Sequence, residues 1–227
     1  MPAGGPVLLS RRISVLQCLA FCALIGVSLF GSAGRIDLPF FWTYLFVCIA
    51  SFSVAGLVID PELFRERIRP GGRPLQLRYY ALILPPVAHW CIAGLDVGRF
   101  HWSDTVPIGA RIAGLAIFTS GLALIVWAMH VNRFFSSVIR LQEDRGHTLV
   151  TDGPYRWVRH PGYVAGLMFC LASGFALGSW SSMVPEALCV PLLLYRTVTE
   201  DRFLKQNLNG YSQYADVVRY RLMPGIW

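Results

Sequence analysis

Apolar residues along this chain come in six blocks that are nearly free of Asp, Glu, Lys and Arg. Crossing the hydrocarbon core of a bilayer takes roughly 20 apolar residues of helix, with a range of about 17–25. The first four blocks meet that length comfortably, and the last two are at or just below the limit. Helices satisfy their own backbone polar groups in lipid, so the pattern predicts an all-α membrane bundle of about six transmembrane helices. The blocks are Ile13–Phe30, Phe40–Ile59, Tyr79–Leu95, Ile108–Val131, Tyr163–Leu177 and Met183–Val198.

Positive charges alternate between the segments that separate these blocks. With the N-terminus placed inside the cell, 17 Lys and Arg residues fall on inside segments and 3 on outside segments, which together make the 20 in the chain. Cytoplasmic loops carry the excess of Lys and Arg, so both termini are predicted to be cytoplasmic. The outside residues are Arg35, Arg99 and Arg111. The inside residues are Arg11, Arg12, Arg65, Arg67, Arg69, Arg73, Arg78, Arg133, Arg140, Arg145, Arg156, Arg159, Arg196, Arg202, Lys205, Arg219 and Arg221.

Composition agrees with a membrane protein and argues against nucleic acid as a partner. Hydrophobic residues make up 55% of the 227 positions and charged residues only 15%, against roughly 25% charged in an average soluble domain. The net charge of +7 is explained by topology, because the positive residues gather on inside segments. The six cysteines all lie within apolar blocks and form no CxxC pair. We therefore expect small packing residues, with no disulfide framework and no metal site.

The first block has an alternative interpretation. Arg11 and Arg12 followed by an apolar run also resemble a secretory signal peptide, with small residues at 31–34 as a cleavage region. We favour an uncleaved span, because the run is long for a signal peptide. Its removal would also break the alternation of charge described above.

The chain divides into two functional parts. Residues 1–131 are spans with short connections, and their one polar elaboration is the turn-rich, basic segment 60–78. That segment is expected either to rest near anionic lipid headgroups or to act as a lid. Residues 132–227 hold two long polar segments, 132–162 and 199–227, on either side of a helical hairpin that turns at 178–182. Both segments should emerge on the same cytoplasmic face, where a site could be assembled between them.

Local signals within 132–227 predict where its helices begin and end. Gly153-Pro154 makes a turn, and Pro161 stops any helix begun at Tyr155. Tyr211, Tyr214, Val217 or Val218, and Leu222 recur at helical spacing, which predicts an amphipathic helix in the tail that ends at Pro224-Gly225.

Two pairs of polar residues stand at the predicted membrane boundary. Arg159 and His160 are expected at the mouth of the fifth span, and Arg196 and Glu200, four residues apart, on one face at the end of the sixth. Ionisable residues at such a boundary are candidates for function. The alternative is that Arg196 pairs with Glu200 or Asp201 only to cap the span.

The motifs of this region resemble a known family. Gly-Pro-Tyr at 153–155, Arg-His-Pro-x-Tyr at 159–163, the acidic pair 200–201 and the closing Tyr-Arg-Leu-Met-Pro-Gly at 220–225 occur in that order. Together they resemble the isoprenylcysteine carboxyl methyltransferases, which are related to the phosphatidylethanolamine N-methyltransferases. The resemblance covers roughly residues 132–227. It implies an enzyme that transfers a methyl group from S-adenosyl-L-methionine to a lipid-like acceptor, which is a carboxylate, a prenyl-cysteine or an amine headgroup.

The resemblance also implies roles for individual residues. Glu200 would hold the α-ammonium of the cofactor, His147 or His160 would bond its ribose or carboxylate, and aromatic and aliphatic side chains would enclose its adenine. Arg196 would act on the acceptor. The implied cofactor-binding residues are Arg140, His147, Thr148, Leu149, Val150, Tyr155, His160, Pro161, Gly162, Tyr163 and Glu200.

Two positions depart from the family pattern, and other function classes stay open. Arg140 stands where eukaryotic-type members carry Gln, which indicates a different arrangement around the cofactor carboxylate or the substrate. Asp201 replaces a second Glu. Membrane sterol and steroid reductases, which use NADPH, share a similar closing pattern and form the alternative enzyme class. A membrane scaffold without activity is a third possibility.

Overall fold

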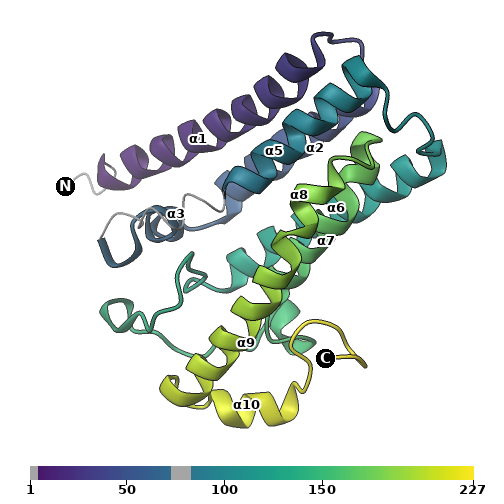
Figure 1. The fold of residues 1–227 in the computed structure, drawn as a ribbon. Coiled ribbons are helices and arrows are strands. Elements are labelled where there is room, and N and C mark those ends of the chain that lie inside the picture. Colours follow the sequence, from purple (N-terminus) through teal and green to yellow (C-terminus); the bar gives the residue numbers. More distant parts are fainter. Residues whose placement is uncertain (1–4, 73–82) are drawn as a thin grey trace.

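The computed structural model describes residues 5–72 and 83–227, and every regular element within them is helical (Figure 1). The predicted all-α class is therefore confirmed. Arg73, Arg78 and the start of the predicted span Tyr79–Leu95 lie outside the described residues. The helices are α1 (Gly5–Gly26, continued by a π-helical turn at Val27–Gly31), α2 (Pro39–Val58), α3 (Pro61–Ile68), α5 (Leu84–Leu95), α6 (Ile108–Val131), α7 (Pro161–Leu177), α8 (Met183–Ala187), α9 (Cys189–Asn207) and α10 (Tyr211–Val217).

Proline and glycine set several helix boundaries. Proline occupies the first turn of α2, α3 and α7, where its missing N–H would have had no intrahelical partner. The Asp60 side chain accepts a hydrogen bond from the Glu62 backbone N–H and caps α3. Helix α7 ends at Gly178, whose φ of 79° lies in the left-handed region that favours glycine. This turn begins the predicted hairpin at 178–182.

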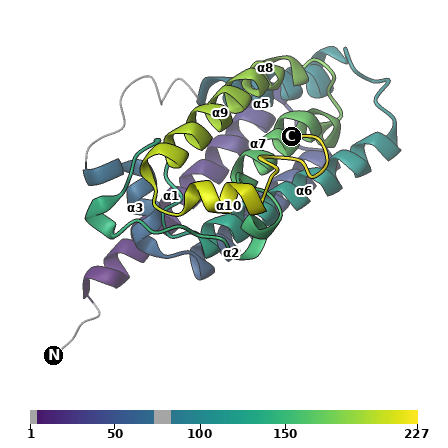
Figure 2. The same cartoon turned by 90° about the horizontal axis from the view of Figure 1, so that it is seen from below.

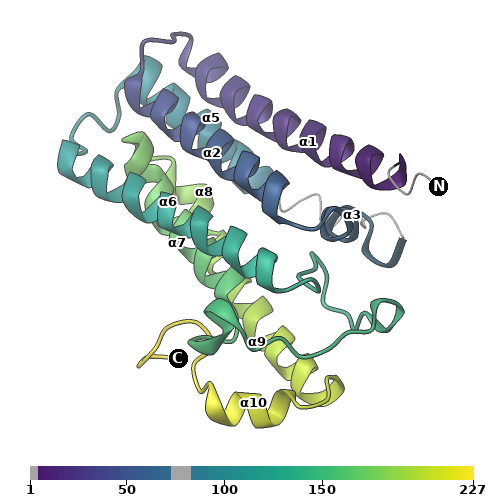
Figure 3. The same cartoon turned by 180° about the vertical axis from the view of Figure 1, so that it is seen from behind.

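The long helices α1, α2, α5, α6, α7 and α9 lie roughly along one common direction, whereas α3 and α10 lie across it, as Figures 1 and 3 show from opposite sides. Their core brings together Leu29 of the first helical segment, Phe41 of α2, Trp90 of α5 and Ala176 of α7. Helices α6 and α7 make the closest pair. A Cβ added to Gly114 of α6 would lie 2.7 Å from the Ala176 backbone nitrogen, so the two backbones approach as closely as small residues allow.

Within the described residues, two helices, Pro39–Val58 and Ile108–Val131, are long and apolar enough to cross a membrane, and Val15–Gly31 and Pro161–Leu177 are shorter apolar helices. A core helix of a soluble protein can have the same composition, but it would be mostly buried. Here only 22% and 33% of the two apolar windows are buried. Large apolar side chains such as Phe46, Leu57 and Ile112 are exposed, which favours a lipid environment for these faces.

Polar structure gathers at one end of the bundle. Helix α3, the 132–160 segment, α10 and the C-terminus lie there, and the connections before α2, α6 and α8 lie at the other end (Figures 1 and 2). The two long polar segments are adjacent, as predicted. The backbone N–H groups of Arg159 and His160 donate to the carbonyls of Tyr220 and Arg221, each over 3.0 Å.

The predicted tail helix is shorter than its apolar spacing indicates. Helix α10 ends at Val217, and the chain then turns without helix through Leu222, which is nevertheless buried. The reason is tertiary. Residues 220 and 221 use their carbonyls to pair with the segment that precedes α7, and this backbone pairing replaces another helical turn.

Substitution of Gly114 tests the close contact between α6 and α7. Gly114→Ala should lower the free energy of unfolding by about 1–3 kcal/mol, because the added methyl would meet the α7 backbone and overpack the contact. Gly109→Ala on the same helix is the matched control, because a Cβ there meets nothing within 4 Å. Thermal unfolding of the detergent-solubilised variants measures the difference. Equal midpoints for the two variants would contradict the described packing.

Candidate active site

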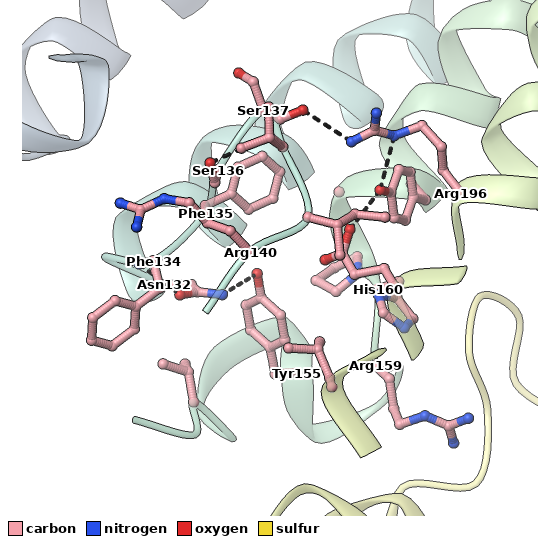
Figure 4. A pocket seen from close by; sticks show the side chains of 18 of the residues that line it. Asn132, Phe134, Phe135, Ser136, Ser137, Arg140, Tyr155, Arg159, His160 and Arg196 are labelled. Carbon is pink, nitrogen blue, oxygen red and sulfur yellow. Dashed lines mark hydrogen bonds between the residues drawn. The ribbon is translucent and has the colours of Figure 1, made fainter. Parts of the chain in front are cut away.

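A cavity of about 680 Å³ lies at the polar end, between the 132–163 segment, α9 and α10 (Figure 4). Every residue that the sequence predicts for a cofactor and acceptor site lines this one cavity. They come from a polar connection, the start of α7 and the end of the hairpin, so the fold unites residues up to sixty positions apart. The predicted residues are Arg140, His147, Thr148, Leu149, Val150, Tyr155, His160, Pro161, Gly162, Tyr163, Arg196 and Glu200.

Asn132 and Tyr155 fix the point where the cavity-lining segment leaves the membrane helices. The Asn132 side-chain oxygen accepts from the Phe134 backbone N–H over 2.9 Å, and its nitrogen donates to the Tyr155 hydroxyl over 3.0 Å (Figure 4). From the other side, the Tyr214 hydroxyl of α10 donates to the Tyr155 carbonyl over 2.7 Å. Tyr155 is thereby held in one orientation, with its ring against the cavity.

His147 is held as a neutral hydrogen-bond donor. Its ring stacks on Phe134 at 4.5 Å between centroids, and its Nδ1 accepts the Gln142 backbone N–H over 3.3 Å. Burial lowers the pKa of His147, and the nearby charges of Arg140 and Arg145 lower it further. An accepting Nδ1 assigns the proton of the neutral ring to Nε2. That nitrogen is the atom with which His147 can donate to a ligand.

Arg140 is occupied by carboxylates of the protein. Its Nε donates to Glu66 of α3 over 2.9 Å, and its Nη1 donates to Asp144 over 2.7 Å. Burial alone would raise the pKa of Glu66, but hydrogen bonds from Arg140 and the Gly71 backbone outweigh burial and leave it lowered. Arg140 therefore borders the cavity with its charge already balanced. Its contacts fasten the cavity-lining segment to α3.

Arg196, Tyr163 and Glu200 meet at one hydroxyl group. The Tyr163 hydroxyl donates to Glu200 Oε2 over 2.6 Å and accepts from Arg196 Nε over 3.3 Å. Arg196 Nη2 also donates to the Ser137 carbonyl over 3.0 Å (Figure 4). Arg196 and Glu200 share a helical face, as predicted, and Tyr163 of α7 links them. The arrangement leaves a carboxylate and a guanidinium one helical turn apart on the cavity wall.

Asp201 lies behind this wall and is fully buried. Arg159 Nε and Arg221 Nε donate to its two oxygens over 2.7 and 2.9 Å, and the Tyr211 hydroxyl donates over 3.1 Å. His160 Nε2 lies 3.3 Å from Asp201 Oδ1. Burial alone would raise the pKa of Asp201, but hydrogen bonds from His160, Arg159 and Arg221 outweigh it and hold the pKa far below its usual range. His160 is thus committed to a structural cluster.

Sequence reasoning missed several residues of the cavity wall. Aromatic side chains supply much of it, and the Phe-Phe pair that follows Asn132-Arg133 was the available signal, because an exposed connection rarely carries two adjacent phenylalanines. Arg67 of α3 came from a segment whose role the sequence left open. The missed wall residues include Arg67, Asn132, Phe134, Phe135, Ser137, Phe203, Tyr211 and Tyr214.

Part of this chain is similar to known proteins. Residues 110–210 match the family model of phospholipid methyltransferases. A probable protein-S-isoprenylcysteine O-methyltransferase of Oryza sativa subsp. indica is 30% identical, over 50% of this chain and 54% of the relative. The protein-S-isoprenylcysteine O-methyltransferase of Schizosaccharomyces pombe is 33% identical, over 37% of this chain and 36% of the relative. The cobalt-zinc-cadmium resistance protein CzcN of Cupriavidus metallidurans is 38% identical, over 57% and 56% respectively.

These matches confirm the resemblance to the isoprenylcysteine methyltransferase type, and they do not favour the reductase alternative. The chain spans about half the length of the rice relative and of CzcN. No solved structure matches it.

The Asp201 cluster predicts a contrast between two adjacent acids. Asp201→Asn should lower the free energy of unfolding by about 3–5 kcal/mol, because it leaves Arg159 buried without a countercharge. Glu200→Gln, on the cavity side of the same helix, is the control and should change stability by less than about 1 kcal/mol. Thermal unfolding in detergent measures both.

The pH dependence of this contrast follows from the sign of the Asp201 shift. A lowered pKa contributes stability that is fully present above the unfolded value of about 3.9 and is lost only as the pH falls through the folded value. The difference in free energy of unfolding between wild type and Asp201→Asn should therefore stay constant from about pH 5 to 9. A gap that closes within this range would show that Asp201 is not the ionised centre of the cluster.

Proposed function

We propose that this chain is an integral membrane methyltransferase that uses S-adenosyl-L-methionine and acts on a lipid-like acceptor, because residues 110–210 match the family model of phospholipid methyltransferases. The observation that carries the proposal is the convergence of Glu200, Tyr163, Arg196 and the His147–Val150 segment on one cavity. At about 680 Å³, this cavity falls within the range of about 300–1,000 Å³ typical of small-molecule sites.

The donor and acceptor groups of the cavity suit this cofactor. Glu200 uses Oε2 to accept from Tyr163, and within the described residues Oε1 has no hydrogen bond, so it can accept from the α-ammonium. His147 can donate from Nε2 to a ribose hydroxyl or to the carboxylate, and it is better placed for this than His160, which Asp201 occupies. Tyr155, Leu149 and neighbouring aromatic rings can enclose adenine.

For methyl transfer, the main task of the protein is to hold the cofactor and the acceptor in the right relative position. When bound, S-adenosyl-L-methionine supplies an activated methyl group on a sulfonium. The chain's residues enclose the site against water and hold the acceptor in line, which accounts for much of catalysis when the acceptor is already nucleophilic. Arg196 would orient the acceptor from one helical turn deeper than Glu200. Apolar residues on the same wall, among them Phe21, Ile125 and Phe169, provide a surface for a hydrocarbon chain.

We also propose that the chain has six spans with both termini in the cytoplasm. With this topology the cavity would lie at the cytoplasmic face. The alternation of positive charge and the collection of polar structure at one end of the bundle both support this topology. Reporter fusions should place residue 104 outside the cytoplasm and residue 145 inside. A cytoplasmic location of residue 104 would contradict the proposed topology, but it would not bear on the chemistry proposed for the cavity.

Cofactor binding tests the proposed activity directly. Detergent-solubilised protein should bind S-adenosylhomocysteine saturably and gain thermal stability from it by mass action, whereas NADPH should have no effect. Calorimetric titration with each compound measures this. Saturable NADPH binding without binding of S-adenosylhomocysteine would instead support the reductase alternative.

The role of Glu200 is tested by Glu200→Gln. The substitution should weaken S-adenosylhomocysteine binding by about 1.5–3 kcal/mol, because a neutral hydrogen bond replaces one between charged groups. Glu143→Gln is the control, because Glu143 is an exposed acid of the 132–162 segment and does not line the cavity. Unchanged affinity in a folded Glu200→Gln protein would refute the assignment.

A further inference from the structure

Arg67 of α3 reaches the cavity from the half of the chain that the family model does not match. Its guanidinium lies over the Phe135 ring, 5.1 Å from the centroid. The Ser137 hydroxyl donates to the Arg67 carbonyl over 2.8 Å, and the Ser137 carbonyl accepts from Arg196 over 3.0 Å. Ser137 thus joins the backbone of one arginine to the side chain of the other. Both guanidinium groups border the same cavity.

The two positive charges act on each other. Burial lowers the pKa of Arg67, and the charge of Arg196 lowers it further, to about 10. Arg67 is therefore still protonated at neutral pH. Within the described part of the chain no carboxylate forms an ion pair with it. The nearby acids of α3 are engaged elsewhere, since Glu66 pairs with Arg140 and Glu62 pairs with Arg145.

A half-buried guanidinium such as that of Arg67, which has no carboxylate partner among the described residues and lies near a second cation, costs stability unless an anion joins it. Most arginines that serve only structure have a carboxylate or several carbonyls around the guanidinium, as Arg159 has here. The planar fork of arginine suits a carboxylate or a phosphate, to which it can donate two parallel hydrogen bonds. A cationic amine would instead be repelled. The apolar residues nearby, including Phe135 and Ile83, would accompany the hydrocarbon part of the same molecule.

We propose that Arg67 and Arg196 together bind the anionic headgroup, a carboxylate or a phosphate, of an amphipathic acceptor. The inference rests on the proposed function in taking the bound molecule to be the methyl acceptor. It gives α3, within the 60–78 segment, a defined task, because this helix carries one of the two cations. It also makes the N-terminal half of the chain a determinant of acceptor choice.

Four amphiphiles with one common hydrocarbon chain test the proposal: oleate, oleyl phosphate, oleamide and oleylamine. Their binding is measured by tryptophan fluorescence in one non-ionic detergent, with S-adenosylhomocysteine present at saturation. Wild type should bind oleate or oleyl phosphate at least about tenfold more tightly than oleamide, and oleylamine most weakly. A preference for oleyl phosphate over oleate would indicate a phospholipid headgroup, and the reverse order a carboxylate acceptor.

Variants then assign the preference to Arg67. Arg67→Met should weaken binding of the preferred anion about tenfold and leave oleamide unchanged, and Arg67→Lys should retain part of the preference. Arg65→Met is the matched control, because Arg65 is exposed on the same helix and does not line the cavity. Arg196→Lys should also weaken anion binding while S-adenosylhomocysteine affinity stays the same.

The outcomes separate this inference from the proposed function. If S-adenosylhomocysteine does not bind but wild type still prefers the anions, the methyltransferase proposal fails and the anion site stands. If wild type fails to distinguish oleate and oleyl phosphate from oleamide, or binds none of the four, the inference is overturned. Equal anion affinities for Arg67→Met and Arg65→Met would overturn it as well. If Arg67→Met does not fold, binding of the four amphiphiles to wild type and to Arg67→Lys decides whether the inference stands.

Discussion

The polar end of this protein depends on one buried carboxylate. Asp201 sits on α9 and binds Arg159 before α7, Arg221 in the tail and Tyr211 of α10, so a single side chain joins four segments. Each of those segments also contributes to, or supports, the cavity wall. An ionised acid without water around it requires several donors, and this requirement fixes where the tail and the segment before α7 can lie. The shape of the cavity follows from that constraint.

Two adjacent acids consequently have different tasks. Successive residues on a helix point about 100° apart, so Glu200 faces the cavity while Asp201 faces the tail. Tyr163 reaches Glu200 from α7, and Arg159 reaches Asp201 from just before it. Glu200, which we propose binds the cofactor, is thereby backed by a buried ionic cluster. Such support is what positions a catalytic group within the small tolerance that transfer chemistry demands.

Helix α3 connects the two halves of the chain in the same manner. Glu66 and Glu62 hold Arg140 and Arg145 of the cavity-lining segment, and Arg67 adds a charge to the cavity itself. The position where the family pattern has Gln is therefore occupied by a residue that binds α3. This explains how Arg140 can replace Gln without placing an unbalanced charge beside the proposed cofactor site.

The sequence by itself determined the all-α class, the long apolar helices and much of the site's membership. Apolar blocks predicted the long helices, Pro161 and Gly178 marked the start and the end of α7, and the ordered motifs identified twelve of the residues that line the cavity, because these signals are local or come from a fixed order along the chain. Only the tertiary structure decided that Arg140 is neutralised by Glu66, that α10 stops at Val217, and that Arg67 lies near Arg196. Those outcomes depend on contacts between segments more than fifty residues apart, where charge balance and backbone pairing override the preference of any single stretch.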